Sequence, residues 1–290
     1  MSFTRLVRFV PQGRQDVVLI GEPLDPNIDV GEEVRGGNNV KVKVFSGTSI
    51  LDFGSATGTI ESIDRILSPL AMTEVGTIRC IGLNYARHAK EANLELPSVP
   101  VVFLKPATSL GDPWPASTII PKFSLVDDTA DYESELCVVI GKTAKNVNEE
   151  DALSYVLGYT ASNDISARKQ QFEQSQWCFS KGFDTSCPIG PTIVSTTAIP
   201  DPSQLRIRGL KNGKIVQDSP LSDLIFSIPK LVSWLSQGTT LPAGTLILTG
   251  TPAGIGMAME PTEYLHDGDE FAVKIWPQIG SLYSTIRMEQ

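Results

Sequence analysis

The sequence DYESELCVVIGK, residues 131–142, sets two glutamates just before an apolar run. The run 136–140 is apolar at every position, which predicts a strand that is covered on both faces. Side chains two residues apart on a strand project from the same face, so we expect the carboxylates of Glu133 and Glu135 to converge. Buried like charges at this separation require either a neutralising cation or the protonation of one carboxylate. The alternative, a pair on a solvated edge strand, does not account for the apolar run that follows.

A third carboxylate, Asp164, follows the next strand-like segment, VLGYTASND. Together with Glu133 and Glu135 it would offer three oxygen ligands and leave coordination positions open for water and substrate, the arrangement that Mg²⁺ prefers. Histidine and cysteine do not cluster nearby, which argues against zinc. We therefore predict a divalent metal site at these three residues.

One of the two histidines, His88, lies in NYARHAKEAN with Glu91 three residues further on. A helix here would bring the two side chains onto one face. A carboxylate held against a ring nitrogen orients the imidazole and raises its basicity, which suits an acid/base dyad. The alternative is an exposed histidine with a chance neighbour, and we assign the second histidine, His266, to a surface loop.

Two Gly-containing segments offer further groups to a site. Lys181 lies in CFSKGFDTSCPIGP, which predicts an irregular turn, and a lysine there could stabilise developing negative charge. The segment LTGTPAGIG, residues 248–256, follows a strand and offers backbone N–H groups that could grip a carboxylate. It lacks the lysine of a phosphate-binding loop, which argues against nucleotide binding.

Composition limits the partners and the compartment. Lys and Arg number 24 against 33 Asp and Glu, a net charge of −9 that repels nucleic acid. No apolar stretch approaches the roughly 18–20 residues that span a bilayer. The four cysteines form no C-x-x-C pair, which indicates free thiols in a reducing compartment, the cytoplasm. Arg5, Arg8 and Arg14 give the N-terminus a weak similarity to a mitochondrial presequence, but its alternating pattern favours a strand.

Two domains are expected. Residues 1–75 read as short strands followed by a helix-like segment near TIESIDRILSPL, a small β-rich N-terminal domain. Residues 76–290 hold a long series of β-type runs with few short helices, in YARHAKEANLEL and in LSDLIFSIPKLVSWLSQG. KNGK, residues 211–214, predicts a hairpin turn. The fold class is therefore α+β, mainly β.

The motifs of residues 76–285, taken in order, resemble the fumarylacetoacetate hydrolase superfamily. They are IGLNYARHAKE, FLKP, DYESELCVVIGK, GYTASNDISAR, FSKGFDTSCPIGP, NGKIVQDSPLSDLIFSIPKLVSWLS and GTLILTGTPAGIG. The resemblance implies a mixed β-sandwich roll, usually a homodimer, with Mg²⁺ or Mn²⁺ on the three carboxylates. It also implies a His88–Glu91 dyad on a lid segment, a polarising Lys181, and substrate-binding positions at Arg168, Gln171 and Thr251. The chain departs from the family at Lys169, where aspartate is common, which leaves the substrate range open.

Residues and resemblance together predict a divalent-metal-dependent enzyme that acts on a small 2-oxo acid or β-diketo acid through a metal-stabilised enolate. Hydrolysis of a C–C bond, decarboxylation of oxaloacetate and keto-enol tautomerisation all share this intermediate. An apolar lining would favour a larger substrate, whereas a second cation opposite the metal would favour a diacid. The alternatives are an isomerase or hydratase of an unsaturated 2-oxo diacid, in aromatic degradation or a biosynthetic pathway, and a catalytically silent metal-binding scaffold.

Overall fold

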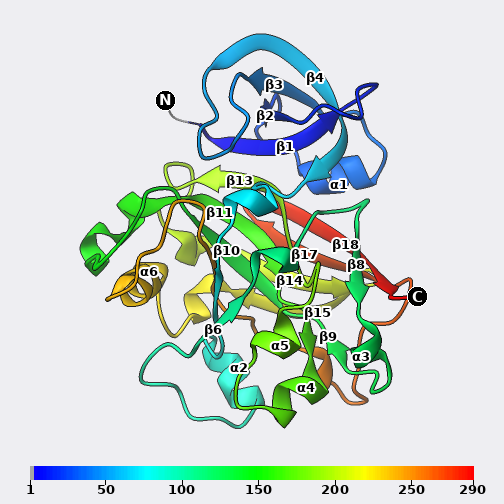
Figure 1. Cartoon of the computed structure of the whole chain (residues 1–290), viewed down its shortest axis with the longest axis vertical. Helices are drawn as coiled ribbons and strands as arrows, with labels where there is room; N and C mark the ends of the chain where they lie inside the picture. The colour runs from blue at the N-terminus through cyan, green and yellow to red at the C-terminus, as the bar shows by residue number, and fades with distance from the viewer. Residues whose placement is uncertain (1–2) are drawn as a thin grey trace.

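The structure is a computed structural model that describes residues 3–290, and β-strands dominate it (Figure 1). An 11-stranded sheet carries the chain from the N-terminal region to the centre of the molecule. In spatial order its strands are β2 (Leu19–Pro23), β3 (Lys41–Phe45), β4 (Ala56–Leu67), β1 (Arg5–Pro11), β13 (Cys187–Ser195), β11 (Val156–Asn163), β10 (Ser134–Ile140), β16 (Leu246–Leu248), β5 (Ile78–Ile81) and β6 (Val102–Lys105), with β7 (Leu110–Gly111) paired to β13.

A second, five-stranded sheet packs against the middle of the first. Its order is β15 (Lys214–Pro220), β14 (Arg206–Lys211), β17 (Glu270–Trp276), β18 (Gly280–Met288) and β8 (Ser117–Ile120), and a short pair is formed by β12 (Ser166–Ala167) and β9 (Ala130–Asp131). Leu136 and Val138 of the large sheet share one apolar core with Ile207, Phe271 and Val273 of the second. Parallel and antiparallel pairs occur in both large sheets. The predicted mainly β, mixed sandwich is confirmed.

The strand predicted from the opening motif is β10. All seven of its residues are buried, and it pairs with β11 on one side and β16 on the other, so it is central to its sheet. Ser134 of β10 lies opposite Asn163, the last residue of β11, in an antiparallel register. Glu133 directly precedes β10 and Asp164 directly follows β11, so this register brings the two residues side by side.

The N-terminal region departs from the sequence prediction in one element. The segment near TIESIDRILSPL is not a helix but belongs to β4, which pairs with both β3 and β1. The β-branched residues of this segment favour an extended backbone, and the two neighbouring strands satisfy its hydrogen bonds. Here tertiary pairing outweighs a helix-like spacing of apolar residues.

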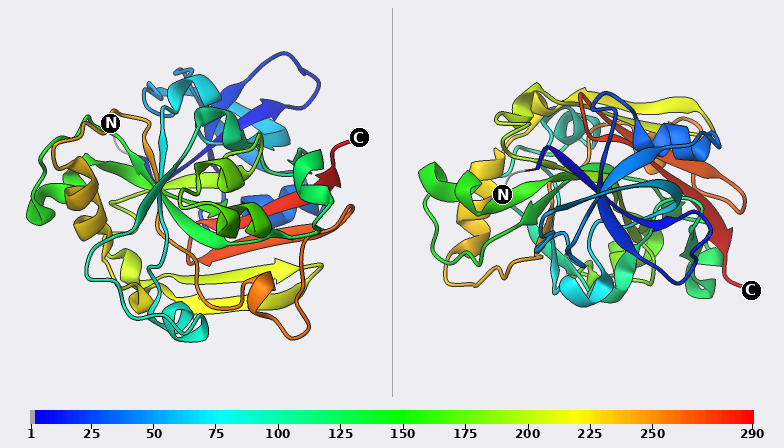
Figure 2. Two further views of the ribbon diagram at one scale, coloured as in Figure 1. Left: turned by 60° about the horizontal axis from the view of Figure 1, so that its bottom comes forward. Right: turned by 90° about the horizontal axis from the view of Figure 1, so that it is seen from above.

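The division into two domains stays a prediction. Arg5 of β1 pairs with Val194 of β13, so the large sheet runs without a break from the N-terminal strands into the rest of the fold. Leu6 and Ile20 pack in the same apolar cluster as Ile193 and Leu246. In Figure 2, the view from above shows the N-terminal strands lying over the remaining strands.

The helices are short: α1 (Val30–Arg35), α2 (Ala86–Glu91), α3 (Lys122–Leu125), α4 (Arg168–Glu173), α5 (Cys178–Lys181) and α6 (Ile228–Ser236). Helices α2, α4 and α5 gather at the end of the molecule away from the N-terminal strands (Figure 1). The predicted hairpin is confirmed, with Asn212 and Gly213 at φ 51° and 79° between β14 and β15. None of the helices within residues 3–290 is long and apolar enough to cross a membrane. All four cysteines are free.

Candidate active site

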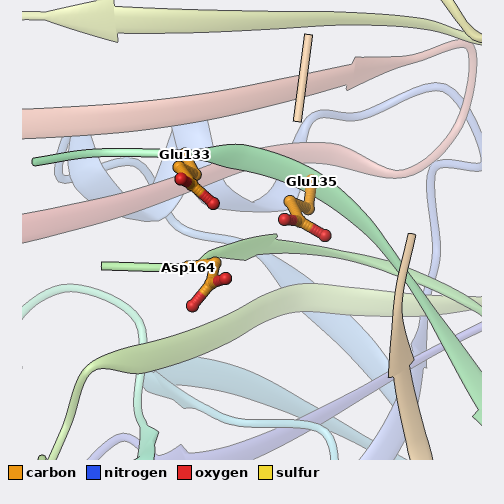
Figure 3. A group of neighbouring side chains, drawn as sticks. All are labelled: Glu133, Glu135 and Asp164. Atoms are coloured by element: carbon orange, nitrogen blue, oxygen red, sulfur yellow. The ribbon is translucent and has the colours of Figure 1, made fainter. Parts of the chain in front are cut away.

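Three acidic side chains meet where β10 begins and β11 ends (Figure 3). One carboxylate oxygen from each of Glu133, Glu135 and Asp164 lies within 4.8 Å of the others. All three residues are buried. The predicted convergence of the three carboxylates is therefore present, while their role as metal ligands stays a prediction.

Two buried lysines face this acidic cluster. Lys181 Nζ, at the end of α5, lies 2.8 Å from Glu133 Oε2 and 2.8 Å from Asp164 Oδ2. Lys105 Nζ, at the end of β6, lies 2.5 Å from Asp164 Oδ1 and donates to the carbonyl of Ser186 at 2.9 Å. Sequence reasoning proposed Lys181 but missed Lys105. The signal for Lys105 is a lysine that follows an apolar run in VVFLKP.

Glu135 is the member of the cluster without an ion pair among the described residues. Its Oε2 accepts the N–H of Gly250 at 2.6 Å, and its buried Oε1 has no hydrogen-bond partner within residues 3–290. Burial, followed by the charges of Asp164 and Glu133, raises the pKa of Glu135 well above its usual value. A buried, unpartnered carboxylate oxygen is costly unless a cation meets it. The position therefore fits a hard divalent ion.

Glu133 is held in the charged form. Burial acts to raise its pKa, but the charges of Lys181 and Arg168 outweigh burial and lower the pKa of Glu133 to about 2. An all-oxygen donor set with one ionised carboxylate matches the preference of Mg²⁺ and Mn²⁺ for hard ligands. The residues present thus fit the metal that the sequence predicts.

Arg168, at the start of α4, links the acidic cluster to a second buried carboxylate. Its Nη1 lies 2.7 Å from Glu133 Oε1 and donates to Gln171 Oε1 at 2.9 Å, while its Nε lies 2.8 Å from Asp131 Oδ2. Its Nη2 is buried without a hydrogen-bond partner within the described chain. Asp131 opens the motif DYESEL, yet sequence reasoning gave it no role.

The departure at Lys169 lies outside this network. The side chain of Lys169 is half exposed, and its Nζ pairs with Asp127 Oδ1 at 2.5 Å. The carboxylates that pair with Arg168 are those of Asp131 and Glu133. The consequence of Lys169 for the choice of substrate stays open.

The predicted dyad is formed within α2. His88 Nδ1 lies 2.9 Å from Glu91 Oε2, and His88 is buried. Glu91 Oε1 accepts the N–H of Gly254 at 2.9 Å. When Nδ1–H donates to the carboxylate, Nε2 of the imidazole is left to accept a proton. The catalytic role of the pair stays a prediction.

The loop of residues 249–257 binds carboxylates through its backbone N–H groups, as predicted for this segment. The carboxylates that it binds are side chains of the protein itself. The N–H groups of Gly250, Gly254 and Gly256 donate to Glu135, Glu91 and Asp131 at 2.6, 2.9 and 2.7 Å. Gly250 and Gly254 have φ of +94° and +102°, which favours glycine at both positions. One short loop therefore contacts a proposed metal ligand, the dyad and the partner of Arg168.

Thr251 is buried within the same loop. Its hydroxyl donates to the carbonyl of Ser134 at 3.1 Å and accepts from Gln217 Nε2 at 2.8 Å. The residues that line the neighbouring cavity do not include Thr251. A contact between Thr251 and substrate stays a prediction, and it would require the hydroxyl to give up its hydrogen bonds with Ser134 and Gln217.

A cavity of about 440 Å³ opens onto the cluster and the dyad. Its polar lining residues are His88, Glu91, Glu133, Arg168, Gln171 and Lys181, and its large apolar ones are Leu83, Leu94, Phe172, Trp177, Ile255 and Met257. Arg168 and Lys181, both bound to Glu133, are the only lysine and arginine among these lining residues. The rest of the described wall is thus without a lysine or arginine.

Comparison with known proteins agrees with this fold. Residues 77–287 match the family model described as fumarylacetoacetate (FAA) hydrolase C-terminal, and the chain belongs to this family. Caffeoylpyruvate hydrolase of Neonothopanus nambi is 42% identical over 296 residues, covering 100% of this chain and 95% of the relative.

Two further relatives cover most of the chain. Oxaloacetate tautomerase YisK of Bacillus subtilis (strain 168) is 42% identical over 212 residues, covering 72% of this chain and 69% of the relative. The crystal structure of 5-carboxymethyl-2-hydroxymuconate delta-isomerase from Mycobacterium smegmatis superposes with a TM-score of 0.79 at 31% identity, covering 98% of this chain and 100% of that one. The chain is therefore similar to enzymes along nearly its whole length.

Proposed function

We propose that this protein is a divalent-metal-dependent hydrolase of acylpyruvates, the β-diketo acids in which an acyl group is joined to pyruvate. The observation that carries the proposal is the shared cavity, in which Glu133 of the acidic cluster and the His88–Glu91 dyad lie in one lining with a set of large apolar side chains. The similarity to caffeoylpyruvate hydrolase supports the same substrate class. An intact dyad is not expected of a silent metal-binding scaffold.

Glu133, Glu135 and Asp164 would hold the metal, proposed to be Mg²⁺ or Mn²⁺. A divalent cation bound there supplies Lewis-acid stabilisation of the negative charge that develops on the oxygens of the 2-oxo acid. With every group counted as ionised, the acidic cluster and the neighbouring Asp131 place four carboxylates, Asp131, Glu133, Glu135 and Asp164, against three cations, Lys105, Arg168 and Lys181. A divalent ion turns this formal charge from −1 to +1, which favours an anionic substrate.

The residues of the chain divide the remaining work. His88 Nε2 takes a proton from water, and the water oxygen bonds to the acyl carbonyl carbon. The C–C bond between this carbon and the pyruvate methylene then breaks, and its electron pair stays on the pyruvate fragment, which takes up the proton. Glu91 stabilises the protonated ring of His88 in between. Lys181 places a positive charge beside the oxygens that become negative.

The apolar part of the cavity lining favours this reaction over isomerisation of an unsaturated diacid. A second carboxylate on the substrate needs a second cation, and the described lining of the cavity holds none besides Arg168 and Lys181. Phe172 and Trp177 instead offer flat apolar surfaces to an acyl group. The lining therefore supports an apolar acyl substituent.

Oxaloacetate tautomerisation is the second candidate, because the relative from Bacillus subtilis is named for it and a dyad that moves protons suffices for it. A screen with Mg²⁺ or Mn²⁺ separates the two. We expect aryl- and alkyl-substituted acylpyruvates to release pyruvate and a carboxylic acid, and added chelator to stop the release. Absence of pyruvate release together with fast conversion of enol to keto oxaloacetate would replace the hydrolase by the tautomerase.

The family resemblance also supports a homodimer, and the free, largely buried thiols support a reducing compartment, which we propose to be the cytoplasm. Light scattering on a size-exclusion column measures the first, and imaging of a tagged chain measures the second. A monomer, or mitochondrial staining, would contradict these proposals without affecting the chemistry.

A further inference from the structure

Asp131 lies behind the cavity wall and is fully buried, yet four donors converge on its carboxylate. Oδ1 accepts the N–H groups of Tyr132 at 2.8 Å and Gly256 at 2.7 Å. Oδ2 accepts the N–H of Met257 at 3.1 Å and Nε of Arg168 at 2.8 Å. Asp131 thus joins the loop of residues 249–257 to the guanidinium that reaches the cavity.

The contact between Asp131 and Arg168 sets the orientation of Nη2, a guanidinium nitrogen of Arg168 that has no hydrogen-bond partner in the described chain. The guanidinium group is planar and its five N–H bonds have a fixed geometry. With Nε held by Asp131 and Nη1 held by Glu133 and Gln171, the position of Nη2 follows from the plane. Nη2 has no partner in the described chain, and Arg168 lines the cavity. A buried guanidinium nitrogen without a partner is suited to bind a carboxylate oxygen of a ligand.

The contact between Asp131 and the loop of residues 249–257 sets the position of another part of the cavity wall. Gly256 and Met257 bind Asp131 through their backbone, and Ile255 and Met257 line the cavity with apolar side chains. A Cβ on Gly256 would lie 2.6 Å from Asp131 Oδ1 and 2.2 Å from the carbonyl of Glu263. The loop is therefore held at a separation from Asp131 that only glycine permits.

We infer that Asp131 is a positioning residue that aims Arg168 Nη2 at the carboxylate of the substrate and fixes its distance from the apolar wall. Asp131 itself neither lines the cavity nor belongs to the group of three clustered carboxylates. The choice of a 2-oxo acid as the ligand rests on the proposed function, but the geometry requires only a small carboxylate in the cavity.

Asp131→Asn tests the inference, since the amide keeps the shape but turns an –NH₂ or a single oxygen toward Arg168 Nε and the loop. Oxalate, which mimics the planar 2-oxo acid end, is titrated by calorimetry into Mn²⁺-loaded protein. We expect the affinity for oxalate to fall at least about tenfold and the affinity for Mn²⁺ to change less than about threefold. Asp218→Asn, which removes the exposed ion pairs of Asp218 with Arg206 and Arg208, is the control and leaves both affinities unchanged.

Unchanged oxalate affinity in folded Asp131→Asn protein, or an equal loss of Mn²⁺ affinity, would overturn the inference. If Asp131→Asn does not fold, Arg168→Lys decides, because lysine keeps the charge but cannot bond Asp131 and Glu133 in one plane. Arg168→Lys should also lower the affinity for oxalate at least about tenfold, and unchanged affinity would refute the proposed role of Asp131 and Arg168. When both variants fold, their double variant should lose no more affinity than either alone.

Steady-state kinetics of Asp131→Asn test the role of Asp131 independently of the oxalate titration. With an acylpyruvate that the wild type hydrolyses, Asp131→Asn should raise KM at least about tenfold and change kcat less than about threefold. A purely structural role would lower the fraction of folded protein and leave KM unchanged. If the wild type hydrolyses no acylpyruvate, the proposed function fails, while the oxalate titration still decides the role of Asp131.

Discussion

The imidazole of His88 is held by Glu91, with 2.9 Å between Nδ1 and Oε2. This contact occupies one ring nitrogen and leaves the other to act in the cavity. His88→Ala should therefore lower kcat for acylpyruvate hydrolysis by about 10²–10⁴-fold. Mn²⁺ affinity, measured by calorimetry, should stay the same because His88 is not part of the acidic cluster. Hydrolysis at the wild-type rate would remove His88 from the mechanism.

Metal binding can be separated from stability by comparing two glutamates. Glu135→Gln removes a buried carboxyl group without breaking a described ion pair, so we expect Mn²⁺ affinity to fall on the order of 100-fold. In the presence of chelator, its melting temperature should not be lower than that of the wild type, because burial already disfavours the charged form of Glu135.

Glu133→Gln is the matched comparison, since Glu133 pairs with Lys181 and Arg168. It should also lose metal but destabilise the chelated protein by up to about 3–5 kcal/mol. Calorimetric scans of both variants check the difference. A chelated Glu135→Gln protein that melts as low as Glu133→Gln would contradict this account of Glu135.

Gly254 lets the loop approach both β15 and the dyad. An added Cβ would lie 2.0 Å from the carbonyl of Val216, and φ is +102°. Gly254→Ala should therefore cost about 1–3 kcal/mol of stability and lower kcat roughly tenfold by moving the N–H away from Glu91. Gly213→Ala is the control, since Gly213 has a φ of +79° but nothing within 4 Å of its Cβ position. An equal loss of kcat in both variants would show that strain alone is responsible.

Leu94 offers a place to change the preference for the substrate. It lines the cavity and is 57% exposed, so Leu94→Arg should fold normally while adding a cation to the apolar wall. We expect kcat/KM to fall for aryl acylpyruvates and to rise for substrates with a second carboxylate, each by about tenfold. Leu96→Arg, at a similarly exposed residue of the same segment outside the cavity lining, should change neither. Kinetics on paired substrates measure the ratio.

Sequence reasoning succeeded where contacts follow from one strand pair. Glu133 and Asp164 flank two adjacent antiparallel strands and Glu135 lies within the first of them, and strand alternation with a covered apolar run suffices to bring the three together. The dyad is likewise local, because Glu91 follows His88 by three positions on one helix.

Lys105 and Asp131 could not be paired in this way. Their partners Asp164 and Arg168 lie 59 and 37 residues away, and no pattern gives the place of β6 relative to β11 or the direction of α4. The segment of β4 failed for the converse reason, since its apolar spacing fits a helix and only the pairing with β1 and β3 makes it a strand.

The N-terminal strands are expected to be required for folding. A chain that starts at residue 71 would leave β13 as an open edge and expose Ile193 and Leu246, which now pack with Leu6 and Ile20. It should aggregate, whereas the full chain stays monodisperse, as light scattering would detect. A folded and active truncated chain would establish residues 71–290 as an independent unit.

The loop of residues 249–257 holds its three carboxylates through backbone N–H groups and not through side chains. Its side chains at Ile255 and Met257 line the cavity instead. Mutations at those two positions can therefore retune which acyl groups are accepted while the acid/base apparatus stays in register. Enzymes with this loop could therefore change their substrate range through these two side chains and keep the same catalytic groups.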